Sequence, residues 1–287
     1  MLSKLNIGFI GGGNLARALI GGLRKIGHPA EKIIVSNRGK EKLLQLNQDF
    51  QVKITESNVT AANQADIIVL AVKPSDIQKV TREVSAASHG KLIVSLAAAV
   101  SISSLQQWLS PFCAGIVRCM TNTPALIGKG ATGLFARHEV TTEQREITAT
   151  LLQAVGQIVW VKSEDELDSL MTLVSCGPAF FFHLMDAMQQ AAEKMGVDAT
   201  ISRAMVIQTA LGATYLAQEK IAHGVSFTDL RAQVATRGGV TERGLKILEA
   251  ASLPRTFYGA MFAAKQRGNE LERALAAQQE QAAKCAL

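Results

Sequence analysis

The stretch Gly8-Phe9-Ile10-Gly11-Gly12-Gly13-Asn14-Leu15-Ala16 decides the fold of the first part of this chain. A short apolar run leads into it, and residues 14–26 carry apolar side chains at the spacing of one helix face. The glycines fit a G-x-G-x-x-A pattern that follows a strand and opens a helix. In that setting Gly11 permits a tight turn, Gly13 lets backbone amides approach a pyrophosphate, and Ala16 keeps the helix close to the strand. We therefore expect a dinucleotide site at the start of a βαβ unit.

The rest of the chain falls into two parts with different patterns. Further short apolar runs predict buried strands at residues 33–35, 67–72, 92–96, 115–119 and 157–161, with helical segments between most of them. Such strands with helical crossovers form a parallel sheet covered on both faces. Beyond Lys162 strand signals vanish, and helices are predicted at residues 167–173, 180–195, 202–220, 241–251 and 257–277. The expected fold is thus α/β: a doubly wound Rossmann domain at residues 1–162, followed by an all-helical domain at residues 163–287.

The bulk composition fits a folded protein that binds small anions. Hydrophobic side chains make up 48% of the 287 residues and charged ones 19%, which is enough for a sizeable core. The formal charge of +6 comes from scattered lysine and arginine, so we expect anionic ligands and no nucleic-acid partner. The four cysteines form no C-x-x-C pair, which argues against a metal site or a disulfide framework.

The first residues and the most apolar stretch of the chain indicate where the protein is located. The start, Met1-Leu2-Ser3-Lys4, leads straight into a predicted strand, which does not resemble a signal peptide. The most apolar stretch, Leu92–Val100, is too short to span a bilayer. We therefore expect a cytoplasmic protein with reduced thiols and no membrane partner.

The end of the second strand indicates which dinucleotide binds. Domains that bind NAD usually place an Asp or Glu about 20 residues beyond the glycine motif, where it binds the ribose 2′-hydroxyl. This chain has Ser36-Asn37-Arg38 there, with a hydroxyl, an amide and a guanidinium but no carboxylate. These groups suit a 2′-phosphate, so we expect NADP(H), with NADPH preferred over NADH. The alternative for Arg38 is a solvated loop arginine.

Five further segments lie where loops are expected to face the dinucleotide: Ala71–Pro74, Arg118–Pro124, Gly177–Ala179, Lys194–Gly196 and Gly238–Thr241. Together with the glycine motif, they resemble the pyrroline-5-carboxylate reductase family in the same order over nearly the whole chain. The Arg-Cys-Met-Thr-Asn-Thr-Pro segment is highly specific, whereas the glycine motif by itself is not. The resemblance implies a Rossmann domain followed by a helical dimerisation domain. It also implies reduction of the cyclic imine 1-pyrroline-5-carboxylate to L-proline by NAD(P)H.

The resemblance further implies a set of site residues. The cofactor positions are Ile10, Gly11, Gly12, Gly13, Asn14, Leu15, Ser36, Asn37, Arg38, Asn58, Ala71, Val72, Lys73, Pro74, Leu96, Ala97 and Ala98. The substrate positions are Asn122, Thr123, Glu164, Gly238, Gly239 and Val240, and the catalytic position is Thr241. A homodimer or higher homo-oligomer through the C-terminal helices is implied as well, and the nearly all-apolar helix predicted at residues 180–195 fits a subunit interface.

The chemistry of the imine supports the roles assigned to Gly238, Gly239 and Thr241. A cyclic imine that carries a carboxylate needs a hydride source, an anion site and a hydrogen-bond partner at its nitrogen. Glycines before a helix expose backbone amides, so Gly238 and Gly239 are expected to bind the carboxylate. Thr241, at the predicted helix start, offers its hydroxyl to the ring nitrogen. The alternative for Thr241 is a plain helix N-cap.

The other substrate and cofactor positions have alternatives too. Ordinary turn chemistry ahead of a proline would explain Asn122 and Thr123. Glu164 fits a solvated acid in the run of acidic residues 164–166 equally well. For Lys73 the alternative is a solvated lysine at a strand end, and we expect its backbone to matter more than its amine.

Two positions depart from the family pattern. Arg237 stands where the family usually has a proline, which loosens the loop by a few tenths to about 1 kcal/mol and adds a cation near the proposed carboxylate site. Cys176 replaces a hydroxyl with a poorer hydrogen-bonding group. Two alternative functions therefore stay open: a related NADPH-dependent imine or 3-hydroxyacid oxidoreductase, and a non-catalytic NADP-binding scaffold. A 3-hydroxyacid dehydrogenase would need a lysine early in the first large C-terminal helix, and residues 177–190 contain none.

Overall fold

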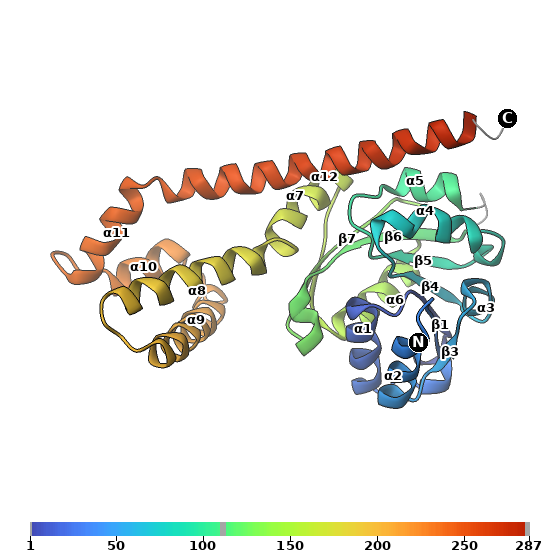
Figure 1. The fold of residues 1–287 in the computed structure, drawn as a ribbon, viewed down its shortest axis with the longest axis horizontal. Helices are drawn as coiled ribbons and strands as arrows, with labels where there is room; N and C mark the ends of the chain where they lie inside the picture. Colours follow the sequence, from blue (N-terminus) through green and yellow to red (C-terminus); the bar gives the residue numbers. More distant parts are fainter. Residues whose placement is uncertain (1, 110–112, 285–287) are drawn as a thin grey trace. The chain divides into compact units, whose positions relative to one another are not determined.

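A computed structural model describes residues 2–109 and 113–284, with side chains described as far as residue 275. The chain forms two compact units, and Figure 1 labels most of their helices and strands. One comprises Met1–Cys176 with Ala264–Leu287 and is called the sheet unit here, and Gly177–Ala263 is called the helical unit. This division by packing falls after Cys176, whereas the change of pattern in the sequence falls after Lys162, because the helix that follows Lys162 packs on the sheet.

The sheet unit is built on one eight-stranded sheet with the order β3-β2-β1-β4-β5-β6-β7-β8. The strands are β1 (Ile7–Ile10), β2 (Ile33–Ser36), β3 (Lys53–Thr55), β4 (Ile67–Leu70), β5 (Leu92–Ser95), β6 (Gly115–Met120), β7 (Gly130–Ala136) and β8 (Gly156–Trp160). The first six run parallel, whereas β7 is antiparallel to β6 and parallel to β8. The predicted Rossmann sheet is confirmed, including its last strand, but the sequence did not predict that β7 and β8 run opposite to the other six strands.

Helices cover both faces of this sheet, and the alternation of side chains along each strand supplies both cores. Val35, Val69 and Val94 pack into one core with side chains of α1 (Asn14–Lys25), α2 (Lys40–Phe50) and α6 (Thr142–Gln153). Ile34, Ile68 and Ile93 pack into the other core with α3 (Asn58–Asn63), α4 (Pro74–Glu83) and α5 (Ile102–Trp108). The unit also holds α7 (Glu164–Val174) and the short 3-10 helices η1 (Leu2–Lys4), η2 (Ala30–Lys32), η3 (Ala86–Ser88) and η4 (Thr123–Ile127).

The sequence missed β3 and β7 for identifiable reasons. β3 has three residues and none of them is buried, so it lacks an apolar run. β7 reads Gly-Ala-Thr-Gly-Leu-Phe-Ala, and glycine and alanine are depleted in strands. One of its glycines makes room for α7: a Cβ at Gly133 would lie 2.6 Å from Cδ2 of Leu170, so a larger residue would have to displace that side chain.

The helical unit contains α8 (Gly177–Lys194), α9 (Ala199–Ile221), α10 (Phe227–Val234), α11 (Val240–Ala250) and the first part of α12 (Leu253–Lys284). All but α10 were predicted. α9 lies against both α8 and α10, and the ring of Phe180 meets that of Phe257 edge to face at 6.2 Å.

Large apolar side chains of the helical unit remain exposed in the single chain. They include Phe181, Phe182, Leu184, Met188, Ile201, Met205, Ile207, Leu211, Tyr215 and Leu216 on α8 and α9. By length and composition the stretch Glu164–Lys194 would also suffice to cross a membrane, a test that single core helices of soluble proteins pass too. Since monomeric soluble proteins rarely expose apolar side chains in such numbers on two adjacent helices, this face has the character of an interaction surface.

Candidate functional site

Four predicted cofactor segments meet at one edge of the sheet, where β1, β2, β4 and β5 end. We call it the carboxyl edge. The amide of Gly11 donates to the carbonyl of Ser36 at 2.9 Å, and that of Ala71 donates to Ile10 at 2.9 Å. The amide of Leu96 donates to the carbonyl of Leu70 at 3.0 Å. In the strand order β1 stands between β2 and β4, so consecutive crossovers diverge here, which is where doubly wound sheets bind ligands.

The glycine motif has the geometry that its residues predict. Gly11 adopts a φ of 103°, and a Cβ there would lie 2.6 Å from the carbonyl oxygen of Ala71. A Cβ on Gly13, the N-cap of α1, would meet no heavy atom within 4 Å. The amide of Gly12 donates to Oδ1 of Asn37 at 3.2 Å, so Asn37 holds the turn. Within the described residues the amides of Gly13, Asn14 and Leu15 have no acceptor, and they remain available to an anion.

Hydrogen bonds order the end of β2. The hydroxyl of Ser36 donates to Oδ1 of Asn58 at 2.7 Å, and Nδ2 of Asn58 donates to Oε2 of Glu83 at 3.0 Å. Arg38 pairs with Asp76 of α4 at 2.7 Å, with 83% of the Arg38 side chain exposed. Local sequence does not indicate the contact with Asp76, which lies 38 residues from Arg38 along the chain. Arg38 is therefore neither a free loop arginine nor an unopposed cation.

The remaining cofactor positions lie on the loops that follow β4 and β5. Lys73 is the N-cap of α4 and Pro74 its first residue, so this turn presents backbone as expected. Leu96 and Ala97 are buried and Ala98 is exposed. Ala99 next to them has a φ of 56°, a left-handed conformation that a residue with a Cβ seldom adopts. The structure thus brings all predicted cofactor positions to the carboxyl edge.

Asn122 and Thr123 follow β6 at the same end of the sheet. Oδ1 of Asn122 accepts from the amide of Ala131 at 3.0 Å, and its Nδ2 donates to the carbonyl of Val174 at 3.3 Å. Both ends of this amide side chain therefore join β6 to β7 and α7. Thr123 is the first residue of η4, with Asn122 as the N-cap. A contact of either residue with substrate stays a prediction.

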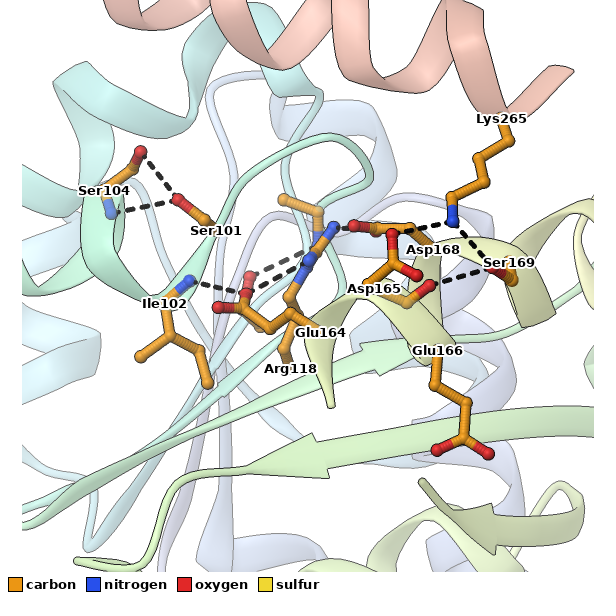
Figure 2. Close-up of polar contacts among 12 residues, drawn as sticks. Ser101, Ile102, Ser104, Arg118, Glu164, Asp165, Glu166, Asp168, Ser169 and Lys265 are labelled. Carbon is orange, nitrogen blue, oxygen red and sulfur yellow. Dashed lines mark hydrogen bonds and ion pairs between the residues drawn. The ribbon is translucent and has the colours of Figure 1, made fainter. Parts of the chain in front are cut away.

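A buried charge cluster beside these residues escaped the sequence analysis (Figure 2). Arg118 in β6 is 1% exposed, and its guanidinium donates from Nη1 to Glu164 at 3.1 Å and from Nη2 to Asp168 at 2.7 Å. Burial raises the pKa of the Asp168 carboxyl, while the Arg118 guanidinium acts to lower it. The sequence does carry a signal for this cluster: one arginine stands in an otherwise uncharged buried strand, and two acids, Glu164 and Asp168, stand four residues apart at and just before the helix predicted at residues 167–173.

Glu164 is thus engaged within the sheet unit. Its Oε1 also accepts from the amide of Ile102 at 2.9 Å, and its Oε2 lies 3.9 Å from the Arg137 guanidinium. The picture of a solvated acid is therefore wrong for Glu164, and its predicted contact with substrate would have to compete with these partners.

The loop before α11 in the helical unit differs in part from expectation. Gly238 has a φ of 73°, and its amide donates to Oε2 of Glu242 at 2.7 Å, which lowers the pKa of that carboxyl. The amide of Gly239 donates to the carbonyl of Thr236 at 2.9 Å. Both glycine amides, the expected anion donors, are therefore occupied.

The helix itself begins one residue earlier than predicted. Gly239 is the N-cap of α11 and Val240 its first residue, so Thr241 is the second helical residue and is not an N-cap. Within the described residues the amides of Val240 and Thr241 have no acceptor. They therefore replace the glycine amides as the donors that face outward at this helix start.

Comparison with known proteins places this arrangement in a family. A family model described as pyrroline-5-carboxylate reductase dimerisation matches residues 164–271, and one described as NADP oxidoreductase coenzyme F420-dependent matches residues 6–99. The pyrroline-5-carboxylate reductase of Pseudomonas aeruginosa is 40% identical over 271 residues, covering 94% of this chain and 98% of that protein.

Solved structures agree with these matches. That of a pyrroline-5-carboxylate reductase from Coxiella burnetii is 38% identical with a TM-score of 0.87 and covers 93% of this chain and 98% of its own. The Plasmodium falciparum pyrroline carboxylate reductase, solved with NADP bound, shares the fold with a TM-score of 0.82 at 24% identity, over 94% of this chain and 99% of its own. With the expected cofactor segments gathered at the carboxyl edge and near-complete coverage by such relatives, the chain belongs to the pyrroline-5-carboxylate reductase family.

Proposed function

We propose that this protein reduces 1-pyrroline-5-carboxylate to L-proline with NADPH. The C=N bond of the imine gains a hydride at carbon and a proton at nitrogen. When bound, NADPH supplies the hydride, so the protein has to bind, orient and polarise. The observation that carries the proposal is the carboxyl edge, where the amides of Gly13, Asn14 and Leu15 are open to a pyrophosphate in a chain 40% identical to a known reductase.

The cofactor side fits NADPH better than NADH. No carboxylate of β2 itself stands at the ribose position, and Ser36, Asn37 and Arg38 offer donors for a 2′-phosphate. The match of residues 6–99 to an NADP oxidoreductase family supports the same choice. Asp76 opposes it in part, because its carboxylate engages the Arg38 guanidinium. A modest preference for NADPH follows, set by the balance between these two charges.

The substrate side is assigned to the start of α11. The outward amides of Val240 and Thr241 bind the substrate carboxylate, and the hydroxyl of Thr241 holds the ring nitrogen. The amide of Gly238 becomes a third donor if the Glu242 carboxylate leaves it. Asn122 and Thr123 complete this set, although each already has a structural position within the sheet unit, whereas the predicted contact of Glu164 with substrate is not retained, because its carboxylate is engaged by Arg118 and the amide of Ile102.

Self-association is part of the proposal. The dimerisation model matches residues 164–271, the range that carries the exposed apolar side chains of α8 and α9. We assign this face to a homodimer formed through the C-terminal helices, and sedimentation as a stable monomer would contradict that assignment. A cytoplasmic location without nucleic-acid or membrane partners stays a prediction from the sequence.

A spectrophotometric assay of NADPH oxidation with 1-pyrroline-5-carboxylate tests the function directly. Turnover with formation of L-proline supports the proposal. Turnover of 3-hydroxy acids in place of the imine would favour the rival oxidoreductase. Such an enzyme would need a lysine early in α8, whereas the one lysine of α8, Lys194, is its last residue. Binding of NADPH without turnover of the imine would favour a non-catalytic scaffold.

A further inference from the structure

The loop between β5 and α5 has a conformation that its own sequence does not impose. It starts with the cofactor positions Leu96–Ala98, passes through Ala99 at a φ of 56°, and ends at Ser101, the N-cap of α5. Alanine has no side-chain group that favours the left-handed region, so the surrounding structure must hold this residue there. The Ser101 hydroxyl accepts from the amide of Ser104 at 3.2 Å, which fixes the far end of the loop to its helix but not to the sheet.

The amide of Ile102 connects the end of this loop to α7. As the first residue of a helix, Ile102 has an N–H without a partner inside that helix. This N–H donates to Oε1 of Glu164 at 2.9 Å, across 62 residues of sequence (Figure 2). Ile102 is fully buried in its side chain, so the bond forms where water competes little for the donor.

Glu164 is itself fixed by charge. The buried Arg118 guanidinium donates to the same Oε1 at 3.1 Å and uses its other terminal nitrogen for Asp168 at 2.7 Å, one helical turn further along α7. Since Glu164 is 22% exposed and Asp168 is 17% exposed, both bonds are largely shielded from solvent. One side chain of β6 thereby orients the first turn of α7, and that turn holds the start of α5.

We propose that Glu164 is a positioning residue for NADPH binding: its carboxylate, oriented by Arg118, holds the Ile102 amide and so keeps the Leu96–Ala98 backbone in its place at the carboxyl edge. This inference rests on the proposed function only in taking that loop to line the NADPH site. It differs from a substrate contact, because Oε1 already has two donors and Oε2 lies near the cation of Arg137. Glu164 acts on the cofactor through the loop and does not touch it.

The test compares three substitutions of one side chain in the full-length protein. Glu164→Ala removes the acceptor, Glu164→Asp keeps the charge but shortens the reach to the Ile102 amide, and Glu164→Gln keeps an acceptor oxygen at the original reach. Asp165→Asn is the matched control, because it removes a charge from the same turn of α7 and its partner is Lys265 in place of Arg118. For each protein the Kd of NADPH is measured by fluorescence, the KM for 1-pyrroline-5-carboxylate by turnover, and hydrogen exchange of residues 96–104 by mass spectrometry.

Alanine and aspartate are expected to raise the Kd of NADPH about tenfold, as the loss of one hydrogen bond to a charged group allows, and to change the KM for the imine less than about twofold. Glutamine is expected to stay within about threefold of the wild type and the control within about twofold, because both retain the acceptor for Ile102. Exchange in residues 96–104 should quicken only with alanine and aspartate. If alanine prevents folding, the aspartate variant carries the same comparison.

Opposite results overturn the inference. A raised KM for the imine with an unchanged Kd of NADPH would make Glu164 a substrate contact. A lower melting temperature without change in either constant would make the cluster a stabilising device only. Failure of the proposed function is seen separately: a wild type that does not turn over the imine refutes the reductase, while the effect of Glu164→Ala on exchange in the loop still tests the positioning role.

Discussion

The pair Arg38–Asp76 sets the expected choice between NADPH and NADH. In the structure the guanidinium meets the Asp76 carboxylate at 2.7 Å, with 83% of the Arg38 side chain and 30% of the Asp76 side chain exposed. An ion pair this exposed contributes about 0.2–1 kcal/mol. Contacts between a guanidinium and a phosphate are stronger, at about 1.5–3 kcal/mol for a charge-assisted hydrogen bond. Arg38 therefore gains by turning to a 2′-phosphate, and Asp76 subtracts from that gain.

These magnitudes give opposite expectations for the two partners. Arg38→Ala should lower kcat/KM for NADPH by about 2- to 110-fold, which is the phosphate contact less the ion pair given up to form it, and should leave kcat/KM for NADH within about twofold, because NADH has no phosphate for the arginine to bind. Asp76→Asn should raise kcat/KM for NADPH by up to about fivefold, the whole of the released ion pair, and leave NADH unchanged. Both effects should shrink as salt rises, because the side chains are exposed.

The assay is the initial rate of cofactor oxidation with 1-pyrroline-5-carboxylate at saturation, with each cofactor varied at two salt concentrations. Lys79→Ala is the control, since it removes an exposed cation from the same helix as Asp76. Equal losses with both cofactors in Arg38→Ala would refute the reasoning, as would weaker use of NADPH in Asp76→Asn.

Three further predictions each concern one residue. Gly13→Ala should change the free energy of unfolding by no more than about 1 kcal/mol, since the added Cβ meets nothing within 4 Å. It should nevertheless raise the Kd of NADPH at least about tenfold, because the methyl group obstructs the pyrophosphate, and a Kd equal to that of the wild type would place the phosphates elsewhere. Thr241→Ala should lower kcat/KM about 10- to 100-fold, because it removes the hydroxyl proposed to hold the ring nitrogen. The melting temperature should not fall, because Gly239 and not Thr241 caps α11, and a destabilised variant with intact kinetics would contradict the prediction. Burial, and next the charges of Lys32 and Arg24, lower the pKa of His28 from 6.5. The unfolded chain therefore binds the proton more tightly, and the free energy of unfolding should fall as pH drops below 6.5. Urea unfolding of His28→Phe should show a smaller fall over the same pH range, and the same dependence on pH as in the wild type would refute the prediction.

Much of the cofactor site followed from local sequence. The glycines at residues 11–13, the strand ends and the loop residues 71–74 all lie at the carboxyl edge as predicted, because parallel strands of one sheet end on the same side. Local patterns failed where a residue's role depends on a distant partner. Nothing near Arg38 in the sequence indicates Asp76, and nothing near Glu164 indicates the amide of Ile102.

The sequence by itself determined the Rossmann domain, the turn that faces a dinucleotide and the helical second half, because each depends on apolar periodicity and on glycine at short range. Only the tertiary structure decided the reversed strand β7, the occupied amides of Gly238 and Gly239, and the charge cluster around Arg118. The physical reason is common to these cases: strand direction, hydrogen-bond occupancy and the pairing of buried charge are settled by which groups meet in space, and sequence spacing does not encode those meetings.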